Sequence, residues 1–98
     1  TAGRADPHAV KRLLDRCMEG RFKDAREELL ALLYKKGLSG EDILKELYTQ
    51  TMDMKIDDAK KLHIIEVIGE YEFRLTEGSN AQIQLEALLA KMVLLLTQ

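Results

Sequence analysis

The chain has 98 residues, enough for one domain with a modest hydrophobic core. Hydrophobic residues make up 46% of it and charged residues 33%, which is typical of a globular chain and not of a disordered one. The net charge of −2 provides no bulk basic surface for nucleic acid, the single cysteine excludes an internal disulfide, and Glu86 and Lys91 interrupt the longest apolar stretch too early for a membrane span.

Five segments have the apolar spacing of helices, and turn-forming residues separate them. Asp6 and Pro7 are typical of an N-cap followed by proline in the first turn, so the first helix is expected to begin there and to end at Gly20. The second helix is expected to run from Phe22 to Gly37 as one continuous helix.

The third helix is expected to begin at a capping box made by Ser39 and Asp42, and Tyr48 lies in its apolar stripe. A loop follows it. The fourth helix is then expected to run from about Asp58 to Glu77.

The corner between the fourth and fifth helices is unusually short. Gly78 is expected to end the fourth helix with a positive φ. Ser79 and Gln82 have the spacing of a capping box that begins the fifth helix. Because loops this short force neighbouring helices to pack against each other, the predicted fold class is all-α, a compact bundle of five helices over residues 7–98.

The fifth helix carries apolar residues on two opposite faces. On a helical wheel, most of its leucines and Met92 form the expected core stripe. Four further apolar residues, spaced i, i+4, i+7 and i+11, lie on the opposite side: Ile83, Ala87, Ala90 and Leu94. A surface helix needs only one apolar stripe, so a second stripe predicts a second neighbour. That neighbour is either the rest of the chain's own bundle or another subunit.

The fourth helix shows the same feature more weakly, because it also has a second apolar face, formed by Leu62, Ile65, Gly69 and Phe73. Two central helices in so short a chain would leave little material to cover both. The pattern therefore favours association with other subunits.

The sequence contains no evident catalytic constellation. Neither G-x-x-x-x-G-K-[ST] nor G-x-G-x-x-G occurs, so no cofactor-binding residue is predicted. His63, Glu66 and Glu70 share one face of the fourth helix, but histidine among carboxylates on a helix surface is usually solvated, so no metal site is predicted. Cys17 lies in the apolar stripe of the first helix and is expected to be a core thiol, as in a reducing, intracellular compartment.

The segment IGEYEFRLTEGSNAQIQLEALLAKM resembles the C-terminal domain of replication factor C small subunits, particularly the archaeal ones. The family pattern, roughly GE…R…EG.N..IQL.ALLA, is matched between Gly69 and Ala90. The upstream segment GRADPHAVKRLLDRCMEGRFKDAREELLALLYKKGLSGEDILKEL is similar too, so the resemblance covers almost the whole chain. Ala81 departs from the acidic residue or proline that is common in relatives, which leaves no particular salt bridge to expect there.

The resemblance implies the collar domain of a sliding-clamp loader. In that family an AAA+ ATPase module precedes the helical domain, the collars hold five subunits in a ring, and the ATPase modules bind the clamp and primer-template DNA. It implies that residues 1–6 are the remnant of a linker to such a module and that ATP and Mg²⁺ belong to that module. Gly78 and Ser79 would set the corner that aims the fifth helix at its neighbours. The implied partners are other large and small clamp-loader subunits, with self-association of this chain and no membrane. The implied compartment is the cytoplasm of an archaeon, near the nucleoid, or a eukaryotic nucleus.

The favoured function is therefore structural: oligomerisation of a DNA-replication ATPase, without catalysis by this chain. One alternative is a helical adaptor that binds a partner through the second apolar face. Another is a nucleic-acid-binding domain that uses Lys35 and Lys36, or Lys60 and Lys61. A stand-alone enzyme is the least favoured function, since no convergent set of catalytic groups is visible.

Overall fold

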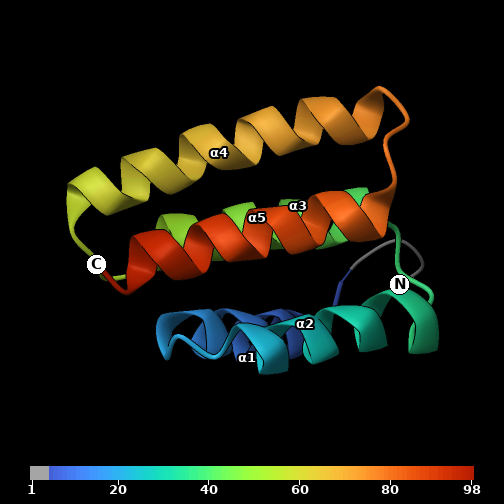
Figure 1. Ribbon diagram of the computed structural model, residues 1–98, viewed down its shortest axis with the longest axis horizontal. Helices are drawn as coiled ribbons and strands as arrows, with labels where there is room; N and C mark the ends of the chain where they lie inside the picture. Colours follow the sequence, from blue (N-terminus) through green and yellow to red (C-terminus); the bar gives the residue numbers. More distant parts are fainter. Residues whose placement is uncertain (1–4) are drawn as a thin grey trace.

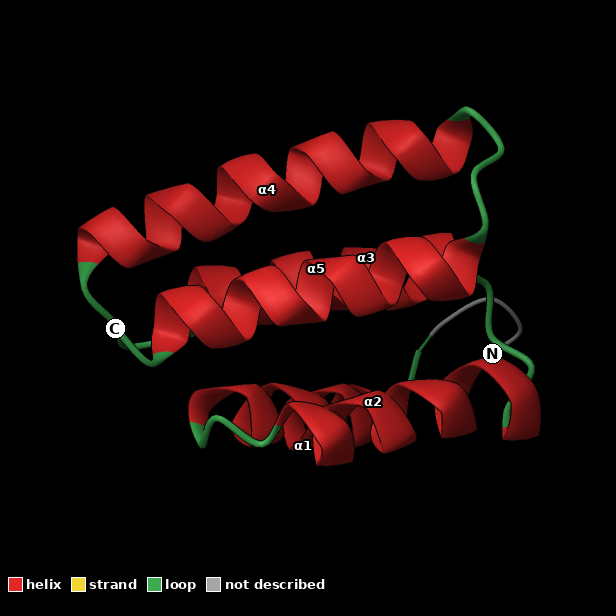
Figure 2. Ribbon diagram, in the orientation of Figure 1, coloured by secondary structure: helices red, strands yellow, loops and turns green. Residues whose placement is uncertain are grey.

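The computed structural model describes residues 5–98, and this range contains helices and loops but no strand (Figure 2). The helices, in chain order, are α1 (Pro7–Met18), α2 (Phe22–Leu30), a short π-helix η1 (Ala31–Lys35), α3 (Gly40–Asp53), α4 (Asp58–Thr76) and α5 (Ala81–Leu96). The predicted all-α bundle of five helices is thus confirmed. Of the predicted linker, residues 1–4 lie outside the described range, whereas Ala5 is buried in the core.

The helices form a bundle of 33 × 25 × 23 Å in which α5 is the central element. Figure 1 shows α4 and α5 side by side and running in opposite directions, with α3 behind α5 and with α1 and α2 below them. Because α5 packs against each of the other four α-helices, its inner face is the middle of the hydrophobic core.

The inner face of α5 is completely buried, and it is formed by Leu85, Leu88, Leu89 and Met92. Burying a side chain of this size contributes about 1.5–3 kcal/mol. These four residues are the main anchor of α5 in the core, and partly buried residues such as Ala87 and Val93 add to it.

Two of the predicted helix starts are confirmed by hydrogen bonds. The Asp6 carboxylate accepts a bond of 3.0 Å from the backbone N–H of His8, and Pro7 occupies the first turn of α1. The Ser39 hydroxyl accepts a bond of 3.1 Å from the N–H of Asp42, so Ser39 is the N-cap of α3. Each cap satisfies a donor that the helix itself cannot pair.

The predicted capping box of Ser79 and Gln82 is wrong, because Asn80 is the N-cap of α5. The Asn80 side chain accepts a bond of 2.9 Å from the N–H of Ile83. The N–H of Ser79 instead donates to the carbonyl of Arg74 at 3.3 Å, across Gly78, which has a φ of +91°. Together with the bond of 3.1 Å from the N–H of Gly78 to the carbonyl of Leu75, the Ser79 bond forms a Schellman motif at the end of α4. Ser79 therefore still belongs to that ending, and Asn80 is the first residue available to begin α5.

Two further expectations for the second and third helices are corrected. The second helix is not a uniform α-helix up to Gly37, because η1 follows α2 and the N–H of Lys36 bonds the carbonyl of Ala31, five residues back, at 3.0 Å. Tyr48 does not belong to the buried stripe of α3, since its side chain is 43% exposed. The aromatic ring lies at the edge of that stripe, where the spacing alone does not decide between core and surface.

Candidate subunit interface

The second apolar face of α5 lies on the outside of the bundle. We call its four residues the outer stripe: Ile83, Ala87, Ala90 and Leu94. Ile83 and Leu94 are 64% and 63% exposed, and the two alanines between them are partly buried. The interpretation that the chain's own bundle surrounds this face is therefore wrong for Ile83 and Leu94. Exposed contiguous apolar patches on monomers are uncommon and usually mark contact surfaces.

On its α2 side, the outer stripe is bordered by a chain of polar contacts. Arg26 of α2 forms an ion pair of 2.9 Å with Glu86, and the Gln82 amide donates to the same carboxylate at 2.9 Å. The hydroxyl of Tyr34 in turn donates to the Gln82 carbonyl oxygen at 2.6 Å. The hydrogen bond from Gln82 and the pairing with Arg26 lower the pKa of the Glu86 carboxyl. Gln82 is thus not a capping residue but a link between α5 and η1.

Tyr34 is a candidate contact residue that the sequence pattern did not predict. Its side chain is 68% exposed, although its hydroxyl is held by Gln82 next to Ile83. Aromatic side chains of this kind are enriched in protein interfaces because they combine a large apolar area with one polar group. In the sequence, Tyr34 is marked only by being an aromatic residue near the predicted end of the second helix.

On its α4 side, the outer stripe borders a groove of about 610 Å³. Its apolar part is formed by Val67, Leu94 and Leu95. The charged and polar residues at this groove include the set considered above as a metal site, and they are His63, Glu66, Glu70 and Lys91. Among residues 5–98, no three histidine, cysteine or carboxylate side chains gather closely enough to hold a metal ion.

A second groove, of about 540 Å³, separates α3 from α4. Tyr48 and Thr49 of α3 line one side of it, and Ile65 and Gly69 of α4 line the other. Gly69 leaves open space there, because a Cβ atom at this position would have no heavy atom within 4 Å. Two residues of the second apolar face predicted for the fourth helix, Ile65 and Gly69, thus line this groove.

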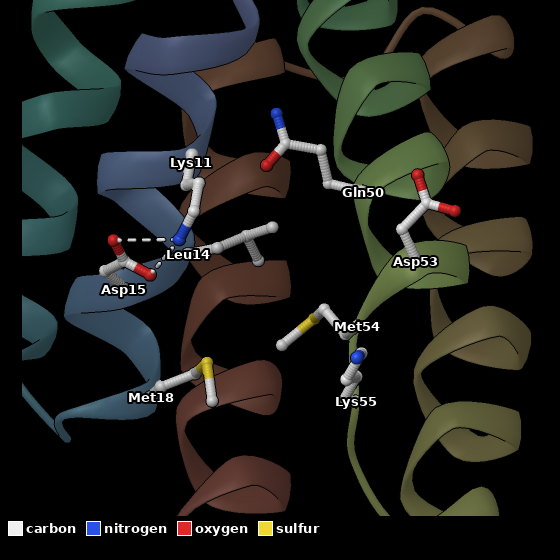
Figure 3. A pocket seen from close by; sticks show the side chains of 8 residues that line it. All are labelled: Lys11, Leu14, Asp15, Met18, Gln50, Asp53, Met54 and Lys55. Carbon is white, nitrogen blue, oxygen red and sulfur yellow. Dashed lines mark hydrogen bonds and ion pairs between the residues drawn. The ribbon is translucent and has the colours of Figure 1, made fainter.

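A third pocket, of about 460 Å³, lies between α1 and the end of α3 (Figure 3). Leu14, Met18 and Met54 provide its apolar surface, and the ammonium of Lys11 pairs with the carboxylate of Asp15 at 3.1 Å. The pocket thus combines an apolar surface with charges of both signs, and two of these charges, Lys11 and Asp15, pair with each other.

The lysines considered for nucleic-acid binding are in part engaged within the chain. Lys60 donates to the backbone carbonyl of Gln98 at 2.7 Å, and Lys61 donates to that of Met52 in the last turn of α3 at 3.1 Å. The ammonium of Lys61 therefore compensates a carbonyl at the C-terminus of α3, where positive charge is favourable, whereas that of Lys60 binds the backbone beyond the end of α5. Lys35 and Lys36 are exposed at the end of η1.

Cys17 is fully buried in the core, as the sequence predicted. Burial raises the pKa of its thiol from about 9 to about 12, so the reactive thiolate is scarce near neutral pH. Within the described part of the chain, no helix is both long and apolar enough to cross a membrane.

Comparison with known proteins gives one consistent result. Residues 5–91 match the family described as the replication factor C C-terminal domain. The chain is 43% identical over 94 residues to a replication factor C small subunit of Methanocaldococcus jannaschii, and 44% identical over 94 residues to that of Methanococcus maripaludis. It is 44% identical over 93 residues to the small subunit of Pyrococcus horikoshii. These alignments cover 96%, 96% and 95% of this chain, but only 5%, 30% and 11% of the respective relatives.

Proposed function

Since the chain belongs to the family of replication factor C C-terminal domains, we propose that it is the collar domain of a sliding-clamp loader. Its function is to hold an AAA+ subunit in a ring with the other clamp-loader subunits, both large and small. The nucleotide, the Mg²⁺ ion, the clamp and the DNA are bound by the ATPase module of the same polypeptide. This domain contributes no catalytic group. The corresponding compartment is the archaeal cytoplasm.

The observation that carries this proposal is the exposure of the outer stripe. Most of the surface of Ile83 and Leu94 is exposed to water, whereas the inner face of α5 is the one that packs in the core. Because both side chains are already about one-third covered, covering the rest would contribute about 1–2 kcal/mol each. This is a reason for the chain to place them against another subunit.

The same arithmetic predicts that the isolated domain associates weakly. Association costs at least about 4 kcal/mol in lost translational and rotational freedom, which is close to what Ile83 and Leu94 can provide. In the intact subunit, the contacts of the other modules add to this contribution. We therefore expect self-association of the isolated chain only at high concentration.

The first test replaces Leu94 with glutamate. A charge placed in an apolar contact is costly unless it is paired, so Leu94→Glu should weaken self-association at least tenfold. The monomer should remain folded, because Leu94 is exposed and surface substitutions usually change stability by about 0.5 kcal/mol or less. Sedimentation equilibrium and circular dichroism on the same sample measure the two effects.

Met18→Glu is the matched control. Met18 is the last residue of α1, is 45% exposed and likewise exchanges an exposed apolar side chain for glutamate, but it lies outside the outer stripe and outside the second apolar face of α4. We expect its association to equal that of the parent chain. If both variants associate like the parent, the outer stripe is not the contact surface. If the parent is monomeric even at high concentration, a helical adaptor for a different partner becomes the better function.

A further inference from the structure

The chain enters the bundle in a fixed position, because the residues just before α1 are tied to the rest of the structure. Ala5 is 1% exposed and belongs to the hydrophobic core, although it precedes the first helix. Asp6 follows it in an extended conformation and caps α1 through its carboxylate. Segments that act as flexible joints have few buried contacts of this kind.

A hydrogen bond from α3 holds the same segment from a second side. The side-chain amide of Gln50 donates to the backbone carbonyl of Pro7 at 2.7 Å, at the short end of the usual range for such bonds. Figure 3 shows Gln50 extending from α3 into the space between α3 and α1. The bond joins residues that are 43 positions apart, so it links the chain entry to a distant element and not to its own helix.

Gln50 is itself held in the orientation that this bond requires. Its amide nitrogen also donates to the carboxylate of Glu46, one turn earlier in α3, at 3.0 Å. The two hydrogens of the amide group therefore each have an acceptor. A side chain that is anchored on its own helix loses less conformational freedom when it binds a second element.

The helix that carries Gln50 is a firm support for the chain entry. The inner face of α3 is buried in the core. At its first residue, Gly40, a Cβ atom would lie 3.0 Å from the Cβ of Ala81 in the first turn of α5. The missing side chain lets the two helices approach closely at this point. The bond from Gln50 therefore ties the chain entry to the body of the bundle.

We propose that Gln50 is a positioning residue that fixes the chain entry on α3, so that residues 5–7 move with the bundle and do not act as a joint to the module that precedes them. This inference rests on the proposed function, because that function supplies the preceding module. Residues 5 and 6, which were expected to belong to a linker, are then part of the rigid body of this domain. A shorter connection restricts the orientations that the preceding module can take relative to the outer stripe.

NMR relaxation of the isotope-labelled chain, measured at a concentration where it is monomeric, tests this proposal. In the parent chain, the backbone order parameters of Ala5, Asp6 and His8 should be about 0.85, the value of a rigid backbone. Gln50→Met keeps a side chain of similar length but removes the donor, so these three values should fall below about 0.6 while those of α5 stay unchanged. A loss of global stability alone would not change fast motion at one end of the chain.

Two further variants show whether the hydrogen-bond donor is responsible. Gln50→Lys provides an N–H donor on a longer side chain and keeps a favourable partner in Glu46, so the order parameters of residues 5–8 should equal those of the parent. Thr49→Ala is the matched control, because the Thr49 hydroxyl donates to the carbonyl of Lys45 within its own helix. It should leave the order parameters of residues 5–8 unchanged.

The outcomes separate this inference from the proposed function. If Gln50→Met leaves the order parameters of residues 5–8 at the parent values, or if Gln50→Lys lowers them as much as Gln50→Met does, Gln50 does not fix the chain entry. Low values in the parent chain would contradict the proposal as well. The outer stripe takes no part in this measurement, so none of these results affects the proposed function. Conversely, unchanged self-association of Leu94→Glu would count against the proposed function and would leave the order of residues 5–8 as it is.

Discussion

The corner between α4 and α5 depends on a backbone angle that glycine adopts more readily than any other residue. Gly78 has a φ of +91°, and a Cβ atom there would meet no heavy atom within 4 Å. Replacing it therefore causes no steric clash with the rest of the fold, and the cost is that of the backbone conformation alone. The sequence predicted this angle because Gly78 stands between a helical pattern and a capping residue.

Gly78→Ala should lower the free energy of unfolding by about 1–2 kcal/mol, because left-handed backbone conformations cost residues with a Cβ about that much. Gly69→Ala is the internal control. Gly69 lies inside α4 and its φ is not positive, so alanine should stabilise the chain by about 0.5–1 kcal/mol. Urea denaturation of the three chains measures both changes. Equal urea midpoints for Gly78→Ala and the parent chain would show that a side chain at this corner costs no stability.

At the scale of whole elements, the existence and approximate bounds of the five helices could be predicted from the sequence. Apolar spacing locates each buried face, and Asp6, Gly20 and Ser39 mark helix ends through local hydrogen bonds that depend on nearby residues only. The π-helix η1 could not be predicted, since the spacing of Leu29 and Leu32 fits an α-helix equally well. Its wider turn is a backbone property that the residue types do not reveal.

The sequence does not decide the first residue of α5, because two capping signals overlap there. Ser79 and Asn80 are both good N-caps, and the choice depends on how α4 ends. Asn80→Ala should destabilise the chain by about 1 kcal/mol, since it leaves the N–H of Ile83 without its acceptor. Ser79→Ala should change stability by less than about 0.5 kcal/mol. Thermal unfolding followed by circular dichroism compares the stability of the two variants. A larger loss of stability for Ser79→Ala than for Asn80→Ala would favour Ser79 as the N-cap.

At the scale of the molecule, the sequence predicted the outer stripe but not its surroundings. The spacing of Ile83, Ala87, Ala90 and Leu94 is enough to place them on one face of α5. Whether that face is covered depends on how the other helices pack. The contacts at its border, such as that between Tyr34 and Gln82, join residues that are 48 positions apart in the chain. Such pairs follow from tertiary packing, and no local pattern contains them.

The grooves could not be predicted from the sequence either, because they also depend on how the helices pack. The sequence indicated that α4 has a second apolar face, and the structure adds that Gly69 opens a space there against α3.

The central claim is that the outer stripe contacts another subunit, and two-dimensional NMR of the isolated chain at increasing concentration tests it most directly. We expect the backbone amide and methyl signals of Ile83, Ala87, Ala90 and Leu94 to shift or broaden as the concentration rises, because weak association changes their surroundings first. Signals from the α1–α3 pocket, such as the methyl groups of Met18 and Met54, should stay unchanged. Spectra that do not depend on concentration, or changes confined to that pocket, would contradict the claim.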